Sequence, residues 1–321
     1  MSHQTRRTLL AGLGGCAFAI GTGWGSASAE EPVSFGYQRS SSLLSALKVE
    51  RGLDARLAPL GFVPRWSLFG NVLDPMNAGS TDFHADVADA VTIFTQAAGA
   101  SLTYYATEAP SPHAEALIVH ADSDVRQVAD LRGRKVAMGK GSGCHYLVLA
   151  LLRQAGLRFA DITPVYLAPP EAAQAFEQRS VDAWAIWDPF LAITQNRLPV
   201  RVVGDGSGGV TGYSRYYMVN TAFAKRRPDV VQAVFDALVE AGQRLRQDPA
   251  AAAALLGPLW GDIPAEVVLQ VNARRSYDVR PVQPADLAAQ QRIADAFLDA
   301  GLIPQRLATA DVPVWQPQRP G

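Results

Sequence analysis

A glycine-rich turn, Gly-Lys-Gly-Ser-Gly-Cys-His-Tyr at residues 139–146, is the sharpest candidate for ligand chemistry in the sequence. It follows a predicted strand at 135–138 and opens a predicted helix at 145–154. Such a turn presents backbone N–H groups and the positive end of a helix to an anion. Its serine adds a hydroxyl donor, or only caps the helix. We expect a ligand to contact Ser142, Gly143, Cys144 and His145.

A second group of donors follows the first predicted strand, at 33–37. The sequence there reads Gln38-Arg39-Ser40-Ser41-Ser42, and apolar residues at helical spacing begin at Leu43. One of the three hydroxyls is expected to cap the helix, as serine does at many helix starts. The others can donate to an anion. We therefore predict ligand contacts from Gln38, Ser40 and Ser41.

One aromatic and one charged residue lie where another strand, at 181–187, is predicted to end. Ligands of open α/β sheets bind outside the carboxyl ends of strands, which is where Trp187 and Asp188 lie in the sequence. Trp187 is interpreted either as a wall of the cleft or as core, and Asp188 either as a helix cap or as a partner for a cation on the ligand.

The segment Tyr213-Ser214-Arg215 offers a guanidinium fork, which suits a sulfonate or a carboxylate. An ion pair between the two halves of the protein is the alternative role for Arg215. Tyr213 and Arg215 are both predicted to line the ligand site.

Several function classes find no support in the sequence. It lacks the Gly-x-Ser-x-Gly elbow, the His-Glu-x-x-His zinc motif and a dinucleotide fingerprint, and no acidic residue is evidently placed to orient His145 toward Ser142. The five histidines are scattered, so we expect no metal and no cofactor. A formal net charge of -1 gives no basic field for nucleic acid.

The elements that position these residues alternate between short strands and helices. Strands are predicted at 33–37, 102–107, 116–120, 135–138, 163–167, 181–187, 201–203 and 216–220, with helices at 68–77, 145–154, 171–178 and 189–194. The last hundred residues are predicted to be helical, at 229–247, 249–256, 264–274 and 284–300. This alternation predicts an α/β protein with helices on both faces of its sheets.

Two irregular segments predict that the chain crosses between two lobes. One is Ala109-Pro110-Ser111-Pro112-His113, and the other is the Gly- and Ser-rich stretch 204–212. Paired crossings form a natural hinge. We expect residues 30–112 and 214–321 to form one lobe and residues 113–213 to form the other.

The first 29 residues have the features of an export signal. Arg6-Arg7 precede an apolar, glycine-rich run at 9–20, and Ala27-Ser28-Ala29 is a cleavage site, which favours a twin-arginine signal over a general secretory one. Leu13-Gly14-Gly15-Cys16 offers an alternative, a lipid anchor at Cys16. Cleavage after Ala29 leaves only Cys144, so an internal disulfide is excluded in the mature chain.

The sequence resembles the aliphatic sulfonate, nitrate and taurine substrate-binding proteins of ABC importers, and the aliphatic sulfonate branch most of all. The resemblance rests on Leu73–Phe83, Ile93–Ala100, Lys140–Tyr146, Asp182–Pro189 and Gln291–Phe297. It implies a type II periplasmic-binding fold of two α/β lobes with two hinge crossings and a helical C-terminal region. It also implies an anion held between the lobes, a membrane permease as partner, a periplasmic location and a monomer.

The chain departs from the pattern of this family at His84, Ala88-Asp89 and Val91-Thr92, and again at Cys144. These positions touch the predicted cleft, so Asp89 joins the candidate ligand contacts and the ligand itself stays open. A small organic sulfonate is the expected ligand. Nitrate, taurine, a sulfate ester or a pyrimidine precursor are the alternatives, and an enzyme or a sensor on the same fold is the alternative to a transport protein.

Overall fold

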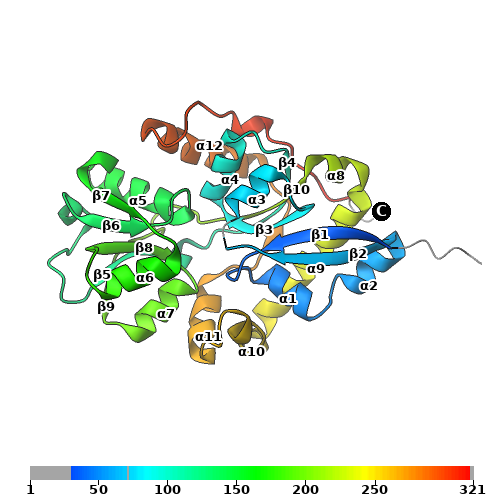
Figure 1. The fold of residues 1–321 in the computed structure, drawn as a ribbon, viewed down its shortest axis with the longest axis horizontal. Helices are drawn as coiled ribbons and strands as arrows, with labels where there is room; N and C mark the ends of the chain where they lie inside the picture. The colour runs from blue at the N-terminus through cyan, green and yellow to red at the C-terminus, as the bar shows by residue number, and fades with distance from the viewer. Residues whose placement is uncertain (1–29, 71, 319–321) are drawn as a thin grey trace, which may run out of the picture.

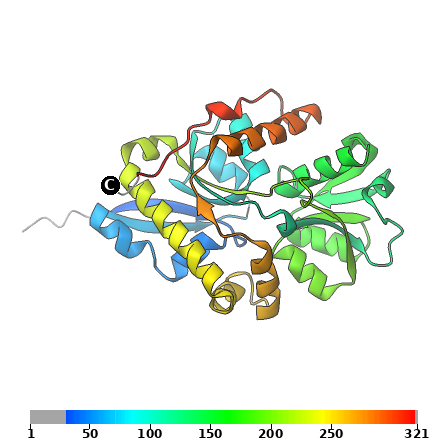
Figure 2. The same cartoon turned by 180° about the vertical axis from the view of Figure 1, so that it is seen from behind.

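The computed structural model describes residues 30–70 and 72–318. The predicted export signal at 1–29, with Cys16, lies outside the described residues. The described chain forms two β-sheets placed side by side, each with helices on both of its faces (Figures 1 and 2).

The first sheet has six strands. In spatial order these are β11 (Val279–Arg280), β4 (Leu102–Glu108), β10 (Arg215–Asn220), β3 (Phe83–Ala88), β1 (Glu31–Tyr37) and β2 (Phe62–Leu68). β1 runs parallel to β2 and β3, whereas β10 is antiparallel to both β3 and β4. The carboxyl ends of β1, β3 and β4 therefore lie at the same edge as the beginning of β10.

The second sheet has five strands. In spatial order these are β7 (Thr163–Tyr166), β6 (Lys135–Met138), β8 (Ala183–Trp187), β5 (Glu115–His120) and β9 (Val200–Asp205). β6 is parallel to β7 and β8, and β5 is antiparallel to β8 and β9. The edge of this sheet that faces the first sheet thus carries the ends of β6, β8 and β9.

Three helices follow strands of the second sheet, namely α5 (Gly143–Gln154), α6 (Pro169–Glu177) and α7 (Phe190–Arg197). The others accompany the first sheet, and they are α1 (Leu43–Val49), α2 (Asp54–Leu57), α3 (Leu73–Ala78), α4 (Asp89–Ala97), α8 (Thr221–Arg226), α9 (Pro228–Gln247), α10 (Pro249–Leu259), α11 (Ala265–Arg274) and α12 (Pro284–Asp299). Short 3-10 turns occur at Ala58–Leu60, Pro112–Ala114, Val128–Leu131, Phe159–Asp161 and Thr309–Asp311.

The chain passes between the sheets twice, from β4 to β5 and from β9 to β10. The two connections lie beside each other, because the Ser111 N–H donates to the Gly212 carbonyl at 2.9 Å and the Gly206 N–H donates to the Pro112 carbonyl at 3.0 Å. Each sheet has apolar cores of its own. Residues of β1, α1 and α9 build a core on the first sheet, and residues of α5 and α6 build one on each face of the second.

One sequence prediction of local structure is wrong in its bounds, and two strands of the first sheet were missed. The helix expected at 68–77 is shorter, since β2 continues to Leu68 and α3 begins only at Leu73, although it does end at Gly79 in the left-handed region, at a φ of 61°. Strands β2 and β3 were not predicted from the sequence. Pro64 within β2 argues against a strand, but β2 lies at the edge of the sheet, where proline is tolerated.

Candidate functional site

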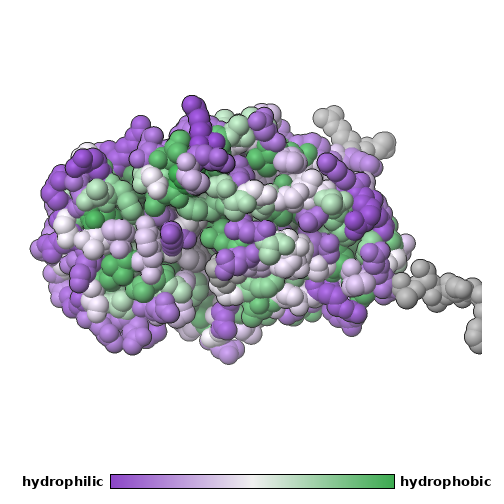
Figure 3. Space-filling view, turned by 45° about the horizontal axis from the view of Figure 1, so that its top comes forward, coloured by the Kyte–Doolittle hydropathy of each residue, from purple (hydrophilic) through white to green (hydrophobic). Residues whose placement is uncertain are grey.

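The two halves of the molecule touch where three connecting segments meet. Gly143, at the start of α5, lies so close to Tyr213 and Ala88 that an added Cβ would be 2.6 Å from the Tyr213 ring and 3.0 Å from the Ala88 methyl. Only glycine fits this approach without displacing a neighbour. Figure 3 shows the face on which the halves meet as a shallow furrow, with hydrophilic side chains at the two outer ends of the molecule.

The beginning of α5 presents free backbone donors at this meeting point. Ser142 caps the helix, since its hydroxyl donates to the Gly139 carbonyl at 2.7 Å and accepts from the His145 N–H at 3.3 Å. The Gly143 and Cys144 N–H groups find no acceptor among the described residues. At this 12-residue helix, the free donors are therefore the backbone N–H groups, and the Ser142 hydroxyl is already occupied.

The three serines after β1 are all buried, but they differ in their hydrogen bonds. Ser41 accepts from the Gln38 N–H at 3.2 Å, and Ser42 accepts from Arg275 at 3.4 Å. Ser40 is 6% exposed, and its hydroxyl has no hydrogen bond to another described residue. Ser40 is consequently the hydroxyl of this cluster that is available to a ligand.

Beneath these serines lies a buried group of four charged residues at the edge of the first sheet, which we call the charge cluster: Asp86, Glu108, Arg215 and Arg275. Arg275 holds Glu108 through two contacts of 3.0 Å and lies 3.6 Å from Asp86, while Arg215 lies 3.3 Å from Asp86. Burial raises the pKa of Asp86, and the two arginines oppose that shift. The formal charges of the cluster cancel.

Among the described residues, Arg215 has two unpartnered guanidinium nitrogens, against one, Nε, in Arg275. It is 3% exposed and its guanidinium lies 5.4 Å from the centre of the Tyr213 ring. Its Nε and Nη2 atoms are buried and have no hydrogen-bond partner in the described structure. Unpartnered buried guanidinium donors are costly, and a bound anion would satisfy them.

Trp187 and Asp188 adjoin the same place from the second sheet. Trp187 is half-buried, meets Phe190 edge to face and lies 3.7 Å from the position of a Cβ on Gly139. The Asp188 carboxylate accepts from the Ala192 N–H at 3.0 Å and from Arg274 at 3.1 and 3.2 Å. Burial raises the pKa of Asp188 to about 6, against the effect of Arg274. Its oxygens are thus occupied by protein donors.

Three further residues that were predicted to contact the ligand are buried, and each is packed or hydrogen-bonded within the protein. Cys144 is fully buried in the core of the second sheet, and burial raises the pKa of its thiol well above the ordinary value. His145 is buried beside Phe297, its Nδ1 accepts from the Gly141 N–H, and burial lowers its pKa to about 4. Asp89 accepts from the Ala90 and Ser214 N–H groups, and burial raises its pKa to about 6.

The structure therefore joins several predicted residues by direct contacts and adds others. Arg215 lies over Tyr213, Tyr213 touches Gly143, and Trp187 lies against the turn that begins at Gly139. Sequence reasoning missed Asp86, Glu108 and Arg275. For Asp86 and Glu108 the signal was a charged residue inside, or at the end of, a strand, as Glu108 ends Leu-Thr-Tyr-Tyr-Ala-Thr, whereas Arg275 follows helix α11 and carried no such signal.

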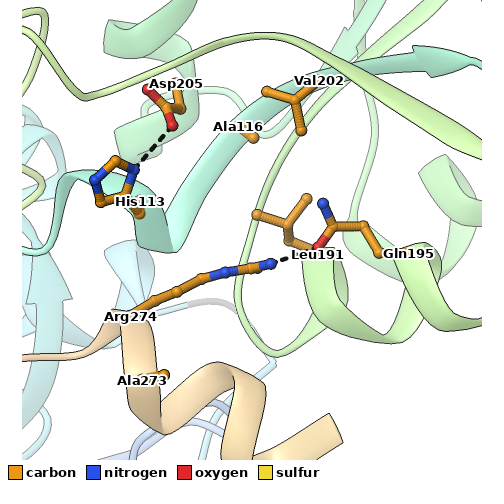
Figure 4. A pocket seen from close by; sticks show the side chains of 8 residues that line it. All are labelled: His113, Ala116, Leu191, Gln195, Val202, Asp205, Ala273 and Arg274. Atoms are coloured by element: carbon orange, nitrogen blue, oxygen red, sulfur yellow. Dashed lines mark hydrogen bonds and ion pairs between the residues drawn. The ribbon is translucent and has the colours of Figure 1, made fainter.

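A cavity of about 380 Å³ lies beside the two connections between the sheets, and its lining includes Arg274, the partner of Asp188. Figure 4 shows its lining, which is His113, Ala116, Leu191, Gln195, Val202, Asp205, Ala273 and Arg274. None of the residues predicted to bind ligand is in this lining. Its polar groups are already paired, His113 with Asp205 at 3.0 Å and Arg274 with Gln195 at 2.6 Å.

Two general features of the described residues complete the description of the site. They contain no group of three or more His, Cys, Asp or Glu side chains that could hold a metal ion. No helix within them is long and apolar enough to cross a lipid bilayer.

Comparisons with known proteins match the chain over most of its length. A sequence model of the family described as NMT1/THI5 like matches residues 70–252. A protein of Escherichia coli (strain K12) named as an aliphatic sulfonates-binding protein is 36% identical over 294 residues, which is 90% of each chain. The alkanesulfonate-binding protein SsuA from Xanthomonas axonopodis pv. citri, solved bound to MOPS, superimposes with a TM-score of 0.82 at 35% identity, over 88% of this chain and 98% of that one.

The desulfurization enzyme DSZB shares the fold at 17% identity, with a TM-score of 0.61 over 87% of this chain and 95% of that one. The likeness to SsuA confirms the predicted type II periplasmic-binding fold. The extent and identity of the sequence matches show that the chain belongs to the aliphatic sulfonate-binding proteins of the NMT1/THI5-like family.

Proposed function

We propose that this protein is the periplasmic solute-binding component of an ABC importer, and that it holds a small organic sulfonate between two lobes without converting it. The lobes of this proposal are residues 30–112 with 214–321, and residues 113–213. Its partners are the sulfonate and an inner-membrane permease, and the protein acts as a monomer released into the periplasm.

The observation that carries the proposal is a set of buried donors without acceptors on both sides of the meeting point. Arg215 contributes Nε and Nη2, and the start of α5 contributes the Gly143 and Cys144 N–H groups. A sulfonate stays ionised at physiological pH, so it needs fixed donors and no titrating partner. Trp187 and Phe190 offer apolar surface to its organic part, at about 25 cal/mol per Å² buried.

An amine-bearing sulfonate finds less support. Asp188, which could have paired with an ammonium group, accepts instead from Arg274 and from the Ala192 N–H. A ligand ammonium group would have to compete with Arg274 for this carboxylate, and a buried cation left unpaired costs several kcal/mol. We therefore rank sulfonates with uncharged tails above taurine.

Catalysis finds no support in the same geometry. The Ser142 hydroxyl donates to a backbone carbonyl, so it is not activated by His145, whose Nδ1 accepts from the Gly141 N–H. The Cys144 thiol is buried and its raised pKa disfavours the reactive thiolate.

Calorimetry with alkyl and aryl sulfonates, sulfate esters, taurine, nitrate and carboxylates tests the proposal, together with mass spectrometry of ligand recovered after incubation. We expect the uncharged-tail sulfonates to bind tightest and to be recovered intact. Tighter binding of nitrate or a carboxylate, or recovery of a cleaved product, would refute it.

One pair of variants tests the site itself. Ser40→Ala should weaken sulfonate binding about ten- to a hundredfold, since a hydrogen bond to a charged group contributes about 1.5–3 kcal/mol. Ser45→Ala, a buried serine on the neighbouring helix α1, is the matched control and should leave affinity unchanged.

A further inference from the structure

Helices α7 and α11 come from different parts of the fold and are joined by polar side chains. α7 follows β8 of the second sheet, whereas α11 precedes β11 of the first. Arg274, the last residue of α11, holds both oxygens of Asp188 with Nη1 and donates to the Gln195 side chain with Nη2 at 2.6 Å. This contact therefore bridges the two halves.

A second set of hydrogen bonds extends the contact along the helices. The Asn196 side chain donates to Oε1 of Gln270 at 2.8 Å, and Nε2 of Gln270 donates to Oε1 of Gln195 at 3.1 Å. Gln195 thus receives one donor from each of two residues of α11. We call the five residues Asp188, Gln195, Asn196, Gln270 and Arg274 the α7–α11 latch.

The latch is connected at both ends to the ligand site. Asp188 directly follows Trp187, and Arg274 directly precedes Arg275 of the charge cluster. Asp188 also fixes the start of α7 through the Ala192 N–H. A movement of Arg274 away from Asp188 would therefore detach α11 from the strand end that carries Trp187, while the Asp188 N–H still donates to the Ala114 carbonyl in its own half.

We propose that Arg274 is a positioning residue that holds the two halves closed over the ligand, through its ion pair with Asp188 and its hydrogen bond to Gln195. The proposal rests on the proposed function, because it assumes that ligand is trapped by closure of the two lobes. It assigns to Arg274 no contact with the ligand.

The surroundings of Arg274 explain how such a contact can open and close. Its side chain borders the 380 Å³ cavity (Figure 4). It is 18% exposed, whereas the Asp188 side chain is 1% exposed. On opening, water from the cavity can hydrate the guanidinium, and Asp188 keeps its bond to the Ala192 N–H. The ion pair therefore favours the closed state without being needed for the folding of either half.

The consequence for binding is kinetic. A contact made only after closure slows the escape of ligand and leaves the first encounter unaffected. If closure is part of the competent state, the apparent Kd rises as the closed fraction falls. Loss of Arg274 should therefore appear in the dissociation rate.

Stopped-flow binding of an alkanesulfonate with an uncharged tail, such as hexane-1-sulfonate, to Arg274→Met tests this proposal, since methionine keeps an apolar stem of similar length. We expect dissociation about tenfold faster and association within twofold of the unaltered protein. Arg197→Met is the matched control, because Arg197 ends α7, the other helix of the latch, but pairs with Glu177 within one half, at 3.1 Å. An unchanged dissociation rate in Arg274→Met, or an equal increase in Arg197→Met, would overturn the proposal.

A double-mutant cycle that combines Arg274→Met with Asp188→Asn tests whether Arg274 acts on ligand release through Asp188 or has a merely structural role. If Arg274 acts through Asp188, the double variant should release ligand no faster than the faster single variant. Independent, multiplying effects would contradict the proposal.

A distance measurement distinguishes failure of the latch from failure of the proposed function. Spin labels at Val49→Cys and Gln178→Cys lie on exposed positions of the two halves, and Cys144 is buried away from the label. In the empty protein, we expect Arg274→Met to shift the distribution of label-to-label distances toward longer values, because the closed conformers that the latch stabilises become rarer. This result does not depend on ligand. If no sulfonate binds the unaltered protein, the proposed function fails, while an unchanged distance would refute the latch alone.

Discussion

Two of the contacts that bridge the halves among the described residues are built from opposite chemistry. The α7–α11 latch is polar and consists of an ion pair and three hydrogen bonds between side chains. The second contact, which we call the aromatic junction, joins α4 and α12 of one half to α5 of the other through Phe94, Phe297, His145 and Tyr146. Its ring centres lie 4.9–6.1 Å apart.

The difference in chemistry indicates that the two contacts have different roles. Hydrogen bonds require particular distances and angles, so a small rotation breaks all those of the latch. Apolar contacts are not directional, so rings can shift against each other and stay buried. We expect the aromatic junction to supply stability throughout, and the latch to distinguish the closed state from the open one.

Phe297→Ala should have the largest effect on this comparison. The ring is fully buried between Phe94 and His145, and its removal leaves a cavity. We expect the free energy of unfolding to fall by about 3–5 kcal/mol in urea titrations. The loss should be several times that of any single polar substitution in the latch. If Phe297→Ala cost less stability than a latch variant, the aromatic junction would not be the main source of stability between the halves.

Acid should weaken the aromatic junction through His145. Burial lowers the pKa of His145 to about 4, below the unfolded value of 6.5, so the unfolded state binds more protons between these values. Stability is therefore complete above pH 6.5 and falls as the pH drops toward 4, by about 2 kcal/mol at pH 5.

The measurement for this effect is urea unfolding at pH 7.5 and 5, in the unaltered protein and in His145→Gln. The loss on acidification should be smaller in the variant. His84, whose pKa burial also lowers to about 4, is present in both proteins and cancels from the comparison. An equal loss in both proteins would exclude His145 as the source.

Gly141→Ala tests how closely the turn before α5 approaches Phe94. Gly141 has a φ of 73°, and an added Cβ would lie 3.1 Å from the Phe94 ring. The left-handed backbone alone should cost about 1–2 kcal/mol. Gly133→Ala is the control, since its φ is 75° and nothing lies within 4 Å of its added Cβ. Any excess loss in Gly141→Ala measures the contact between the halves.

Gln270→Ala should have the smallest effect on stability. Gln270 contributes neutral hydrogen bonds to Asn196 and Gln195, each of which contributes about 1 kcal/mol or less. We expect an almost unchanged thermal unfolding temperature and a dissociation rate raised two- to threefold. A marked loss of stability with an unchanged dissociation rate would mean that the latch is ordinary structural packing.

Much of the fold was predictable from local pattern. Helix α9 begins at Pro228 and ends at Gln247, close to the predicted 229–247, because its apolar positions recur at helical spacing. The Ser142 cap followed from a serine before a helix. In contrast, β2 was missed because Arg65 and Pro64 obscure its alternation, and its pairing with β1 supplies the information that the residues themselves lack.

The candidate site was predictable only in part, for a related reason. Serine and glycine clusters at strand ends indicated where donors gather, and Arg215 was among them. Which donors stay free was not visible. Ser142 and Asp188 are occupied by protein partners, whereas Ser40 and two nitrogens of Arg215 are not.

By itself, the sequence determined the α/β class, the helical C-terminal region and the places where polar side chains leave the strands, since these depend on neighbours a few residues away. Only the tertiary structure decided the hydrogen-bond partners, because they come from far along the chain: Arg274 and Asp188 are 86 residues apart, and Arg275 and Glu108 are 167 residues apart. A buried donor counts as free or occupied only when every group around it is known. That is why the latch and the charge cluster emerged only from the folded protein.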